Sequence, residues 1–130
     1  MAIHELHREG LVAPAAERVD LAPDIHRQRL VIEGNVTHTI DAESIVRYLT
    51  GLSHVTDMVP LMTPVTHRSD LYGWAGWIHW ETSGAHFYAW EQPRRFFSVD
   101  MYTCKAFDAQ DAVDYTVDFF EPTETTWFGF

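Results

Sequence analysis

The chain has 130 residues, a formal net charge of −10 at pH 7 and a pI near 5.0. Its nine lysine and arginine residues form no basic cluster suited to a phosphate backbone, which argues against a nucleic-acid-binding protein. Hydrophobic residues make up 46% of the chain and aromatic residues 14%, which is typical of one domain with its own core rather than of a disordered chain.

The one cysteine cannot form an internal disulfide, so the chain has no extracellular disulfide framework. No apolar run approaches the length of a membrane span, and the N-terminus lacks the basic and apolar regions of a signal peptide. We therefore expect a soluble cytoplasmic protein that does not associate with a membrane.

Residues 1–24 contain one glycine and two prolines that interrupt regular structure, and we expect an N-terminal extension before a single domain over residues 25–130. A short helix over Ala2–Arg8 would place His4 and His7 at a spacing compatible with a metal. Because no further ligand lies nearby, the pattern favours a solvated helix face, and we expect no metal site.

The next part of the chain predicts one strand and one helix. Residues Arg29–Glu33 alternate in polarity and indicate a strand. Asp41 is a plausible N-cap for the following helix, and Gly51 lies where a C-terminal signal is expected. The apolar positions at helical spacing are Ile45, Val46, Leu49 and Leu52. This stripe predicts a helix that packs on a sheet.

Two further strands are indicated between residues 58 and 81. Residues Met58–Thr66 are apolar and β-branched, but two prolines remove backbone donors, which favours an edge strand or an irregular one. A polar break at His67–Asp70 separates it from a strand over Gly73–Glu81. The tryptophans of that strand, including Trp80, fit either an aromatic wall for a flat ring or a sulfonium cation, or ordinary core packing.

Residues 83–90 and 96–104 alternate with period two and predict a β-hairpin with the short linker 91–95. In both runs the odd positions are mainly apolar, whereas the even positions carry groups capable of chemistry. The reactive even positions are His86, Tyr88, Asp100, Tyr102 and Cys104. The hairpin therefore has one face for a core and one face for a site.

Without a bulge, the hairpin has a defined register. His86 then faces Asp100, and Thr82 lies beside Cys104. An imidazole, a carboxylate and a thiol would lie on one side of one sheet. Asp100 would be able to orient His86, although a cross-strand pair without a catalytic role fits the pattern as well.

The last part of the chain predicts a second helix and a final strand. Asp108 is the expected N-cap, Pro122 ends the helix, and the tail Thr123–Phe130 has the composition of an edge strand. The resulting order is β-α-β-β-β-β-α-β. It predicts an α+β two-layer sandwich, with a mainly antiparallel sheet and two helices on one face.

Two stretches of the hairpin resemble the small prokaryotic S-adenosylmethionine decarboxylases, which are self-processing pyruvoyl enzymes. The family pattern runs roughly E-S-H-x-S-x-H-T-W-P-E and then V-D-V-[FY]-T-C-G. Here the chain reads E-T-S-G-A-H-F-Y-A-W over Glu81–Trp90 and V-D-M-Y-T-C over Val99–Cys104. The resemblance spans roughly residues 26–125, with its specific motifs in the hairpin. It implies the family's fold, a role in polyamine biosynthesis and, since the family pairs protomers, a homodimer.

The resemblance also implies a mechanism. Ser83 occupies the place of the serine that attacks the preceding carbonyl, forms an ester and becomes an N-terminal pyruvoyl cofactor. Such a carbonyl forms a Schiff base with a substrate amine and acts as an electron sink. Cys104 occupies the place of the general acid that reprotonates the substrate carbon.

The chain departs from the family pattern at several positions. The family histidine that promotes cleavage, five residues after the serine, is replaced by Tyr88, whose phenol is a poor base at neutral pH. The residue before the serine is Thr82, the residue after it is Gly84, and Lys105 follows the cysteine. His86 lies on the same sheet face as Tyr88, so it is the candidate for a relocated base.

Three functions therefore remain open. The first is a pyruvoyl-dependent lyase that decarboxylates S-adenosylmethionine or a related amine. The second is elimination or cyclisation of S-adenosylmethionine with release of methylthioadenosine, which needs a base rather than an acid. The third is a homologue that binds a ligand and does not process itself. For a small-molecule substrate of this kind we expect Glu81, Trp80 and Trp90 to form binding contacts, although Trp90 also fits a structural anchor.

Overall fold

A computed structural model of the protein describes residues 19–130. The helix predicted at Ala2–Arg8, with His4 and His7, lies outside the described residues. The elements are, in chain order, β1 (Gln28–Asn35), α2 (Ala42–Val55), β2 (Val65–Ser69), β3 (Gly73–His79), β4 (Ser83–Trp90), β5 (Phe96–Thr103), α3 (Ala109–Phe120) and β6 (Glu124–Gly129). Neither helix among these residues is long and apolar enough to cross a membrane.

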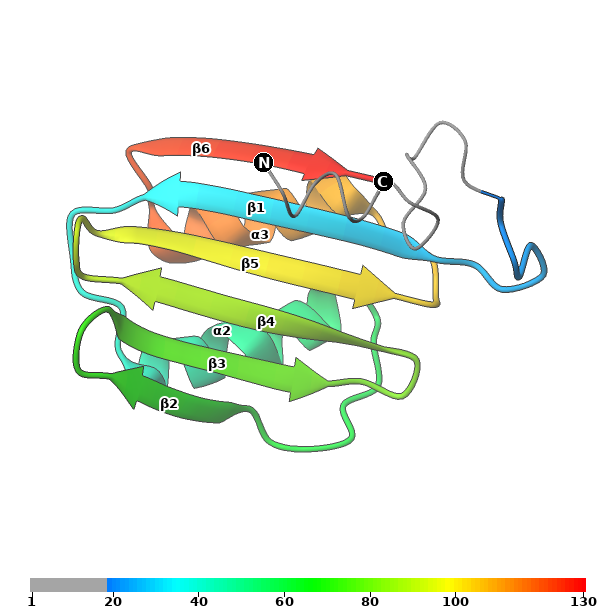
Figure 1. The fold of residues 1–130 in the computed structure, drawn as a ribbon, viewed down its shortest axis with the longest axis horizontal. Coiled ribbons are helices and arrows are strands. Elements are labelled where there is room, and N and C mark those ends of the chain that lie inside the picture. The colour runs from blue at the N-terminus through cyan, green and yellow to red at the C-terminus, as the bar shows by residue number, and fades with distance from the viewer. Residues whose placement is uncertain (1–18) are drawn as a thin grey trace, which may run out of the picture.

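The strands form one six-stranded sheet in the order β2-β3-β4-β5-β1-β6, and all neighbouring strands are antiparallel. Both helices lie behind the sheet in the view of Figure 1. We call this side the helix-covered face and the opposite side, which includes His86 and Asp100, the open face. The predicted element order and the α+β two-layer sandwich are confirmed. The division into residues 1–24 and 25–130 stays a prediction.

The core lies between the sheet and the helices, because odd positions of the hairpin and alternate positions of β1 point toward α2 and α3. Its largest fully buried side chains include Leu30, Ile32, Tyr48, Phe87, Phe97, Met101 and Phe120. The ring centroids of Phe87 and Phe97 lie 5.1 and 5.0 Å from that of Phe120, within the range of favourable aromatic contacts. This aromatic cluster fixes the hairpin against α3.

Helix α2 begins as the sequence predicts and ends later. Asp41 accepts a hydrogen bond from the backbone N–H of Ser44 at 2.9 Å, as an N-cap does. The prediction that Gly51 marks the helix end is wrong, because α2 continues to Val55. A Cβ on Gly51 would lie 2.1 Å from Oη of Tyr115 in α3, so this glycine permits close contact between the helices.

The edge strand β2 starts at Val65 and includes His67, which the sequence pattern predicts to lie in a polar break. Polar residues are suited to an edge strand, because their exposed side chains need no core. The two prolines that weakened the prediction lie before the strand. One of them, Pro60, forms an isolated bridge with Trp80.

The predicted register of the hairpin is confirmed. His86 pairs with Asp100, and the backbone N–H of Cys104 donates to the carbonyl oxygen of Thr82 at 3.2 Å. The odd positions of β4 are buried, from Ser83 to Ala89. Alternation and a short linker were sufficient to place these residues, because both constraints act within one hairpin.

Candidate active site

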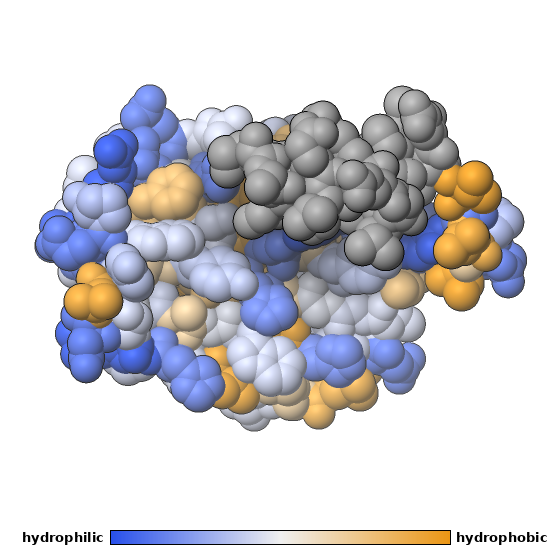
Figure 2. Space-filling model, in the orientation of Figure 1, coloured by the Kyte–Doolittle hydropathy of each residue, from blue (hydrophilic) through white to orange (hydrophobic). Residues whose placement is uncertain are grey.

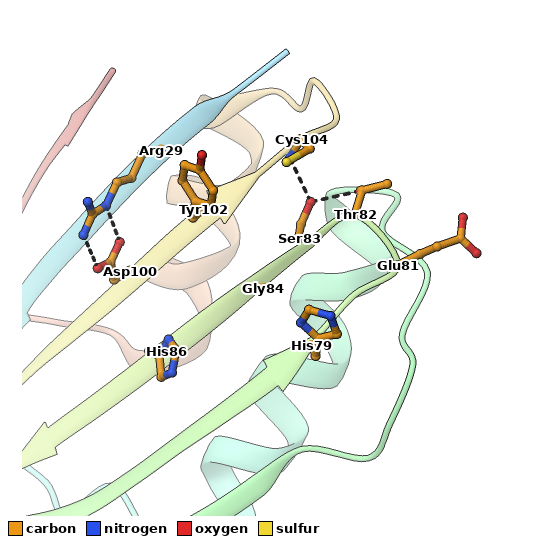
Figure 3. A pocket seen from close by; sticks show the side chains of 10 residues that line it. All are labelled: Arg29, His79, Glu81, Thr82, Ser83, Gly84, His86, Asp100, Tyr102 and Cys104. Atoms are coloured by element: carbon orange, nitrogen blue, oxygen red, sulfur yellow. Dashed lines mark hydrogen bonds and ion pairs between the residues drawn. The ribbon is translucent and has the colours of Figure 1, made fainter. Parts of the chain in front are cut away.

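An open cavity of about 550 Å³ lies on the open face, where β4 begins and β5 ends. Figure 3 shows the side chains that line it, which come from β1, β3, β4, β5 and the turns between them. The lining residues are Arg29, His79, Glu81, Thr82, Ser83, Gly84, His86, Asp100, Tyr102 and Cys104. Its volume is within the range of small-molecule sites in proteins.

A tight turn places Ser83 at the edge of this cavity. Trp80 and Ser83 exchange backbone hydrogen bonds of 2.8 and 3.3 Å, with Glu81 and Thr82 forming the loop between them. Ser83 is the first residue of β4 and is 7% exposed. Its position at the strand end brings its hydroxyl to the cavity, although it belongs to the odd, core-facing set.

The backbone N–H of Cys104 is shared between two neighbouring oxygens. It donates to the Thr82 carbonyl oxygen at 3.2 Å and to Oγ of Ser83 at 3.2 Å. The hydroxyls of Thr82 and Ser83 share a further hydrogen bond of 3.0 Å, shown in Figure 3. A hydroxyl, the preceding carbonyl and a donor that polarises this carbonyl are therefore held together.

His86 lines the cavity but lies further along β4 than Ser83. Its ring stacks between Trp77 and Tyr88, with centroid distances of 6.1 and 6.2 Å. The strand rise of about 3.3 Å per residue places the backbone of His86 roughly 10 Å from that of Ser83. Tyr88 is further away still and is not among the residues that line the cavity.

Asp100 has a different partner from the one the sequence suggests. Its carboxylate accepts two hydrogen bonds from the Arg29 guanidinium, at 2.9 Å from Nε and 2.7 Å from Nη2. The hydrogen bond and the charge of Asp100 raise the pKa of Arg29 above its usual value. The expectation that Asp100 orients His86 is therefore corrected: the two residues face each other in register, but the carboxylate is bound by Arg29.

Five residues of the cavity were absent from the predicted site: Arg29, His79, Thr82, Gly84 and Tyr102. Arg29 reaches it because β1 pairs with β5, a neighbour relation that local pattern does not reveal. His79 pairs with Gly84 across β3 and β4, so it lies directly beside the start of β4. Its place on the polar side of a predicted strand was a usable signal, since alternation assigns it to the same face as His86.

The predicted tryptophan contacts do not lie at this cavity. Trp80 is fully buried on the helix-covered face, where its Nε1 donates to Oγ of Ser53 at 2.8 Å. Trp90 lies at the other end of β4 and packs against Tyr88 and Phe96. Two histidines and Tyr102, rather than indoles, provide the rings of the cavity. Glu81 is at the rim, and its side chain points away from Ser83 in Figure 3.

Other features of the described residues bear on cofactors. Cys104 is a free, exposed thiol, and no group of three His, Cys, Asp or Glu side chains within residues 19–130 is arranged to hold a metal ion. The position of Ser83 is suited to the precursor of a pyruvoyl group, because its hydroxyl lies beside both the preceding carbonyl and the cavity.

Comparisons with known proteins agree with the fold. A family model for S-adenosylmethionine decarboxylase matches residues 32–129. A crystal structure of the adenosylmethionine decarboxylase from Aquifex aeolicus VF5 is similar, with a TM-score of 0.67, 16% identity, and coverage of 82% of this chain and 89% of that chain. No curated protein matches in sequence.

The fold is thus that of a small S-adenosylmethionine decarboxylase-like α+β protein. The match over most of the chain places it in a defined group: the protein belongs to the S-adenosylmethionine decarboxylase family.

Proposed function

We propose that this protein is a pyruvoyl-type lyase, which cleaves its own chain before Ser83 and acts on S-adenosylmethionine or a related amine. The observation that carries the proposal is the shared Cys104 N–H, which donates to both the Thr82 carbonyl oxygen and the Ser83 hydroxyl. This arrangement brings the nucleophile of a self-cleavage step next to its electrophile, with a donor directed at the oxygen that gains charge.

In the first step, Oγ of Ser83 attacks the carbonyl carbon of Thr82. The C–N bond between the two residues breaks, and an ester with a free amine on residue 83 forms. The hydroxyl proton is transferred and the amide nitrogen gains one, so no external reactant is consumed. The Cys104 N–H stabilises the negative charge on the Thr82 oxygen, and the Thr82 hydroxyl, 3.0 Å from Oγ, is placed to relay the proton.

In the second step, a base removes the Cα proton of residue 83 while the bond between its Cβ and Oγ breaks, and Thr82 leaves as a C-terminal carboxylate that keeps this oxygen. Addition of water and loss of ammonia then leave a pyruvoyl group at position 83. When present, this group supplies the electron sink for bond breaking at the substrate. The Cys104 thiol, which is exposed and lines the same cavity, is suited to donate a proton to the substrate carbon.

Two histidines are candidates for the base. His86 is the candidate from the sequence, and His79 is the candidate from the structure, since it faces Gly84 across the strand pair. Tyr88, in the place of the family histidine, lies outside the cavity lining. We favour His79 because a directly opposite cross-strand neighbour is closer to the start of β4 than a residue further along it.

Intact-protein mass spectrometry tests the proposal. The expected result is two chains, residues 1–82 and 83–130, and reaction of the second chain with carbonyl reagents. Ser83→Ala should remain full length, whereas Ser98→Ala, a matched control on β5, should be cleaved normally. A wild-type chain of full mass that is insensitive to carbonyl reagents would reject self-processing and favour the ligand-binding homologue.

The same measurement separates the two histidines. His79→Gln should slow self-cleavage by about 100-fold or more, the usual range for loss of a general base. His86→Gln should change the rate little. The reverse result would assign the base to His86, and normal cleavage in both variants would remove the histidines from this step.

A second candidate reaction is elimination or cyclisation of S-adenosylmethionine, with release of methylthioadenosine. The observation that favours it is the pair of imidazoles at the cavity, because this reaction requires proton removal from the substrate. Analysis of products distinguishes the candidates. Carbon dioxide release indicates decarboxylation, whereas methylthioadenosine without carbon dioxide indicates elimination or cyclisation.

We further propose that the protein is a cytoplasmic homodimer. The free, exposed thiol of Cys104 suits a reducing compartment. From His86 at the cavity, a row of neighbouring rings continues along the open face, in which Tyr88 lies 6.2 Å from His86 and 5.9 Å from Trp90 between centroids. Figure 2 shows polar and apolar residues interspersed on this face, as in many interfaces between soluble protomers.

A further inference from the structure

The turn after β5 carries two groups of the candidate site. Its first residue, Cys104, provides the backbone N–H that donates to the Thr82 carbonyl oxygen and to Oγ of Ser83, and its thiol lines the cavity. Strand β5 ends at Thr103, and residues 104–106 are exposed. An exposed segment outside a strand opens more readily than the sheet does, so the direction of the Cys104 N–H depends on the contacts of the turn.

Lys105 ties this turn to the end of α2. Its ammonium group donates a hydrogen bond to the backbone carbonyl oxygen of Asp57 and lies 3.5 Å from a carboxylate oxygen of the same residue. Within the part of the chain that the structure describes, no other side chain of residues 104–106 forms a hydrogen bond or an ion pair. The next attachment is at Phe107, whose backbone forms two hydrogen bonds with the Gln28 side chain, at 3.0 and 3.2 Å. Lys105 therefore makes the first side-chain contact after the strand.

Residues 53–59, which we call the α2 end segment, also hold the turn before β4. Ser53 accepts a hydrogen bond from Nε1 of Trp80 at 2.8 Å, and both side chains are fully buried. The carbonyl oxygen of Val59 accepts a hydrogen bond from the backbone N–H of Glu81 at 2.9 Å. These contacts fix the turn that presents the nucleophilic hydroxyl. One segment of the chain therefore contacts both halves of the candidate site.

The α2 end segment offers Lys105 one fixed acceptor and one exposed acceptor. The backbone N–H of Asp57 donates to the carbonyl oxygen of His54 at 3.2 Å, and that of Met58 donates to the carbonyl oxygen of Ser53 at 2.8 Å. These bonds hold the backbone on both sides of the Asp57 carbonyl group. The Asp57 side chain is 98% exposed, and exposed ion pairs contribute little. The hydrogen bond to the carbonyl oxygen is therefore the contact that can position the turn.

We propose that Lys105 is a positioning residue, which holds the Cys104 N–H toward the Thr82 carbonyl oxygen through its hydrogen bond to the backbone of Asp57. Lys105 stands where the family pattern has glycine, which has no side chain for such a contact. It does not line the cavity, so it acts through Cys104 rather than on a substrate. This role rests on the proposed function only where it concerns self-cleavage, because the hydrogen bond of Cys104 is a property of the fold.

Amide hydrogen exchange measured by NMR tests this role in a Ser83→Ala background, which cannot cleave itself and keeps the Thr82 carbonyl oxygen as acceptor. Adding Lys105→Met should speed exchange of the Cys104 N–H by about three- to fivefold, the upper range for loss of one exposed contact. Lys105→Arg, which keeps a donor on a long side chain, should restore slow exchange. Arg94→Met, at the opposite end of the hairpin, is the control and should leave exchange at Cys104 unchanged.

Asp57→Asn separates the two acceptors of Lys105. Asparagine keeps the backbone carbonyl group and tolerates the φ of 55° at this position, but it removes the charge of the side chain. Exchange at Cys104 should therefore change by less than twofold. An effect as large as that of Lys105→Met would overturn the assignment to the carbonyl oxygen.

Self-cleavage provides a second readout. With Ser83 intact, Lys105→Met should slow cleavage by about three- to fivefold, and Lys105→Arg should restore the rate. Unchanged exchange at Cys104 in Lys105→Met overturns the inference. Equally faster exchange at the Phe87 amide in the core also overturns it, because that result indicates a general loss of stability. If the wild-type chain is not cleaved, the proposed function fails, and the exchange measurements alone decide the role of Lys105.

Discussion

Phe87 and His86 are neighbours on β4, yet their surroundings are opposite. Phe87 is fully buried, with its ring 5.2 Å from that of Tyr48 and 5.1 Å from that of Phe120. His86 is exposed on the open face, where its ring stacks with the rings of Trp77 and Tyr88. One strand thus provides stability on its helix-covered face and chemical groups on its open face.

The difference explains how the family fold persists while the site changes. Gly84 and Tyr88 depart from the family pattern and lie on the open face, and Thr82 and Lys105 depart from it in the segments that flank the hairpin strands. These positions bury little apolar surface, so substitution there costs little folding free energy. Selection on function can therefore act on the open face without disturbing the core.

The largest expected contrast is between the two neighbours themselves. Phe87→Ala should lower the free energy of unfolding by about 3–5 kcal/mol, because it leaves a cavity among aromatic rings. His86→Ala should change it by no more than about 0.5 kcal/mol. Urea unfolding measures both values. Equal losses would show that the open face contributes to stability as much as the core does.

Two glycines provide a contrast of intermediate size. Gly76→Ala on β3 should destabilise the fold by about 1–3 kcal/mol, because its Cβ would lie 2.6 Å from Ile45 of α2. Gly84→Ala should cost less than about 1 kcal/mol, since its closest new contact is at 3.2 Å and alanine reduces the entropy lost on folding. The difference in urea midpoints checks the comparison. A larger loss at Gly84 would mean that the fold itself requires glycine at this position.

Features of this molecule that depend on residues close together in the chain were predictable from the sequence, whereas features that depend on residues far apart in the chain were not. The hairpin register was predictable because a short linker fixes the pairing of His86 with Asp100. Strand order was not predictable in this way, so the predicted site did not include Arg29. This residue binds the carboxylate of Asp100, 71 positions away along the chain. Alternation assigns a residue to a face, but it does not identify which strand lies beside it.

The candidate site was predicted in part for the same reason. Ser83 and Cys104 lie at the cavity because the hairpin brings them together. Trp80 was expected to contact substrate, but its partner is Ser53 on α2, which no local pattern connects to it. Gly51 was mistaken for a helix end because its actual neighbour, Tyr115, belongs to another helix.

The smallest expected effect concerns Asp41, the N-cap of α2, and depends on pH. The backbone N–H of Ser44 lowers the pKa of Asp41, and the Ser44 side chain adds to this effect. A carboxylate whose pKa is lowered in the folded state stabilises the protein at pH values above the pKa that the carboxylate has in the unfolded state, about 3.9. This contribution is lost as pH falls through the pKa of the folded state.

Asp41→Ala should therefore unfold at slightly lower urea concentrations than wild type at pH 7, with the gap closing below about pH 4. Asp41→Asn, which keeps the capping oxygen without the charge, should lie between them at pH 7. A gap that stays constant down to pH 2 would contradict a charged cap and assign the effect of Asp41 to hydrogen bonding alone.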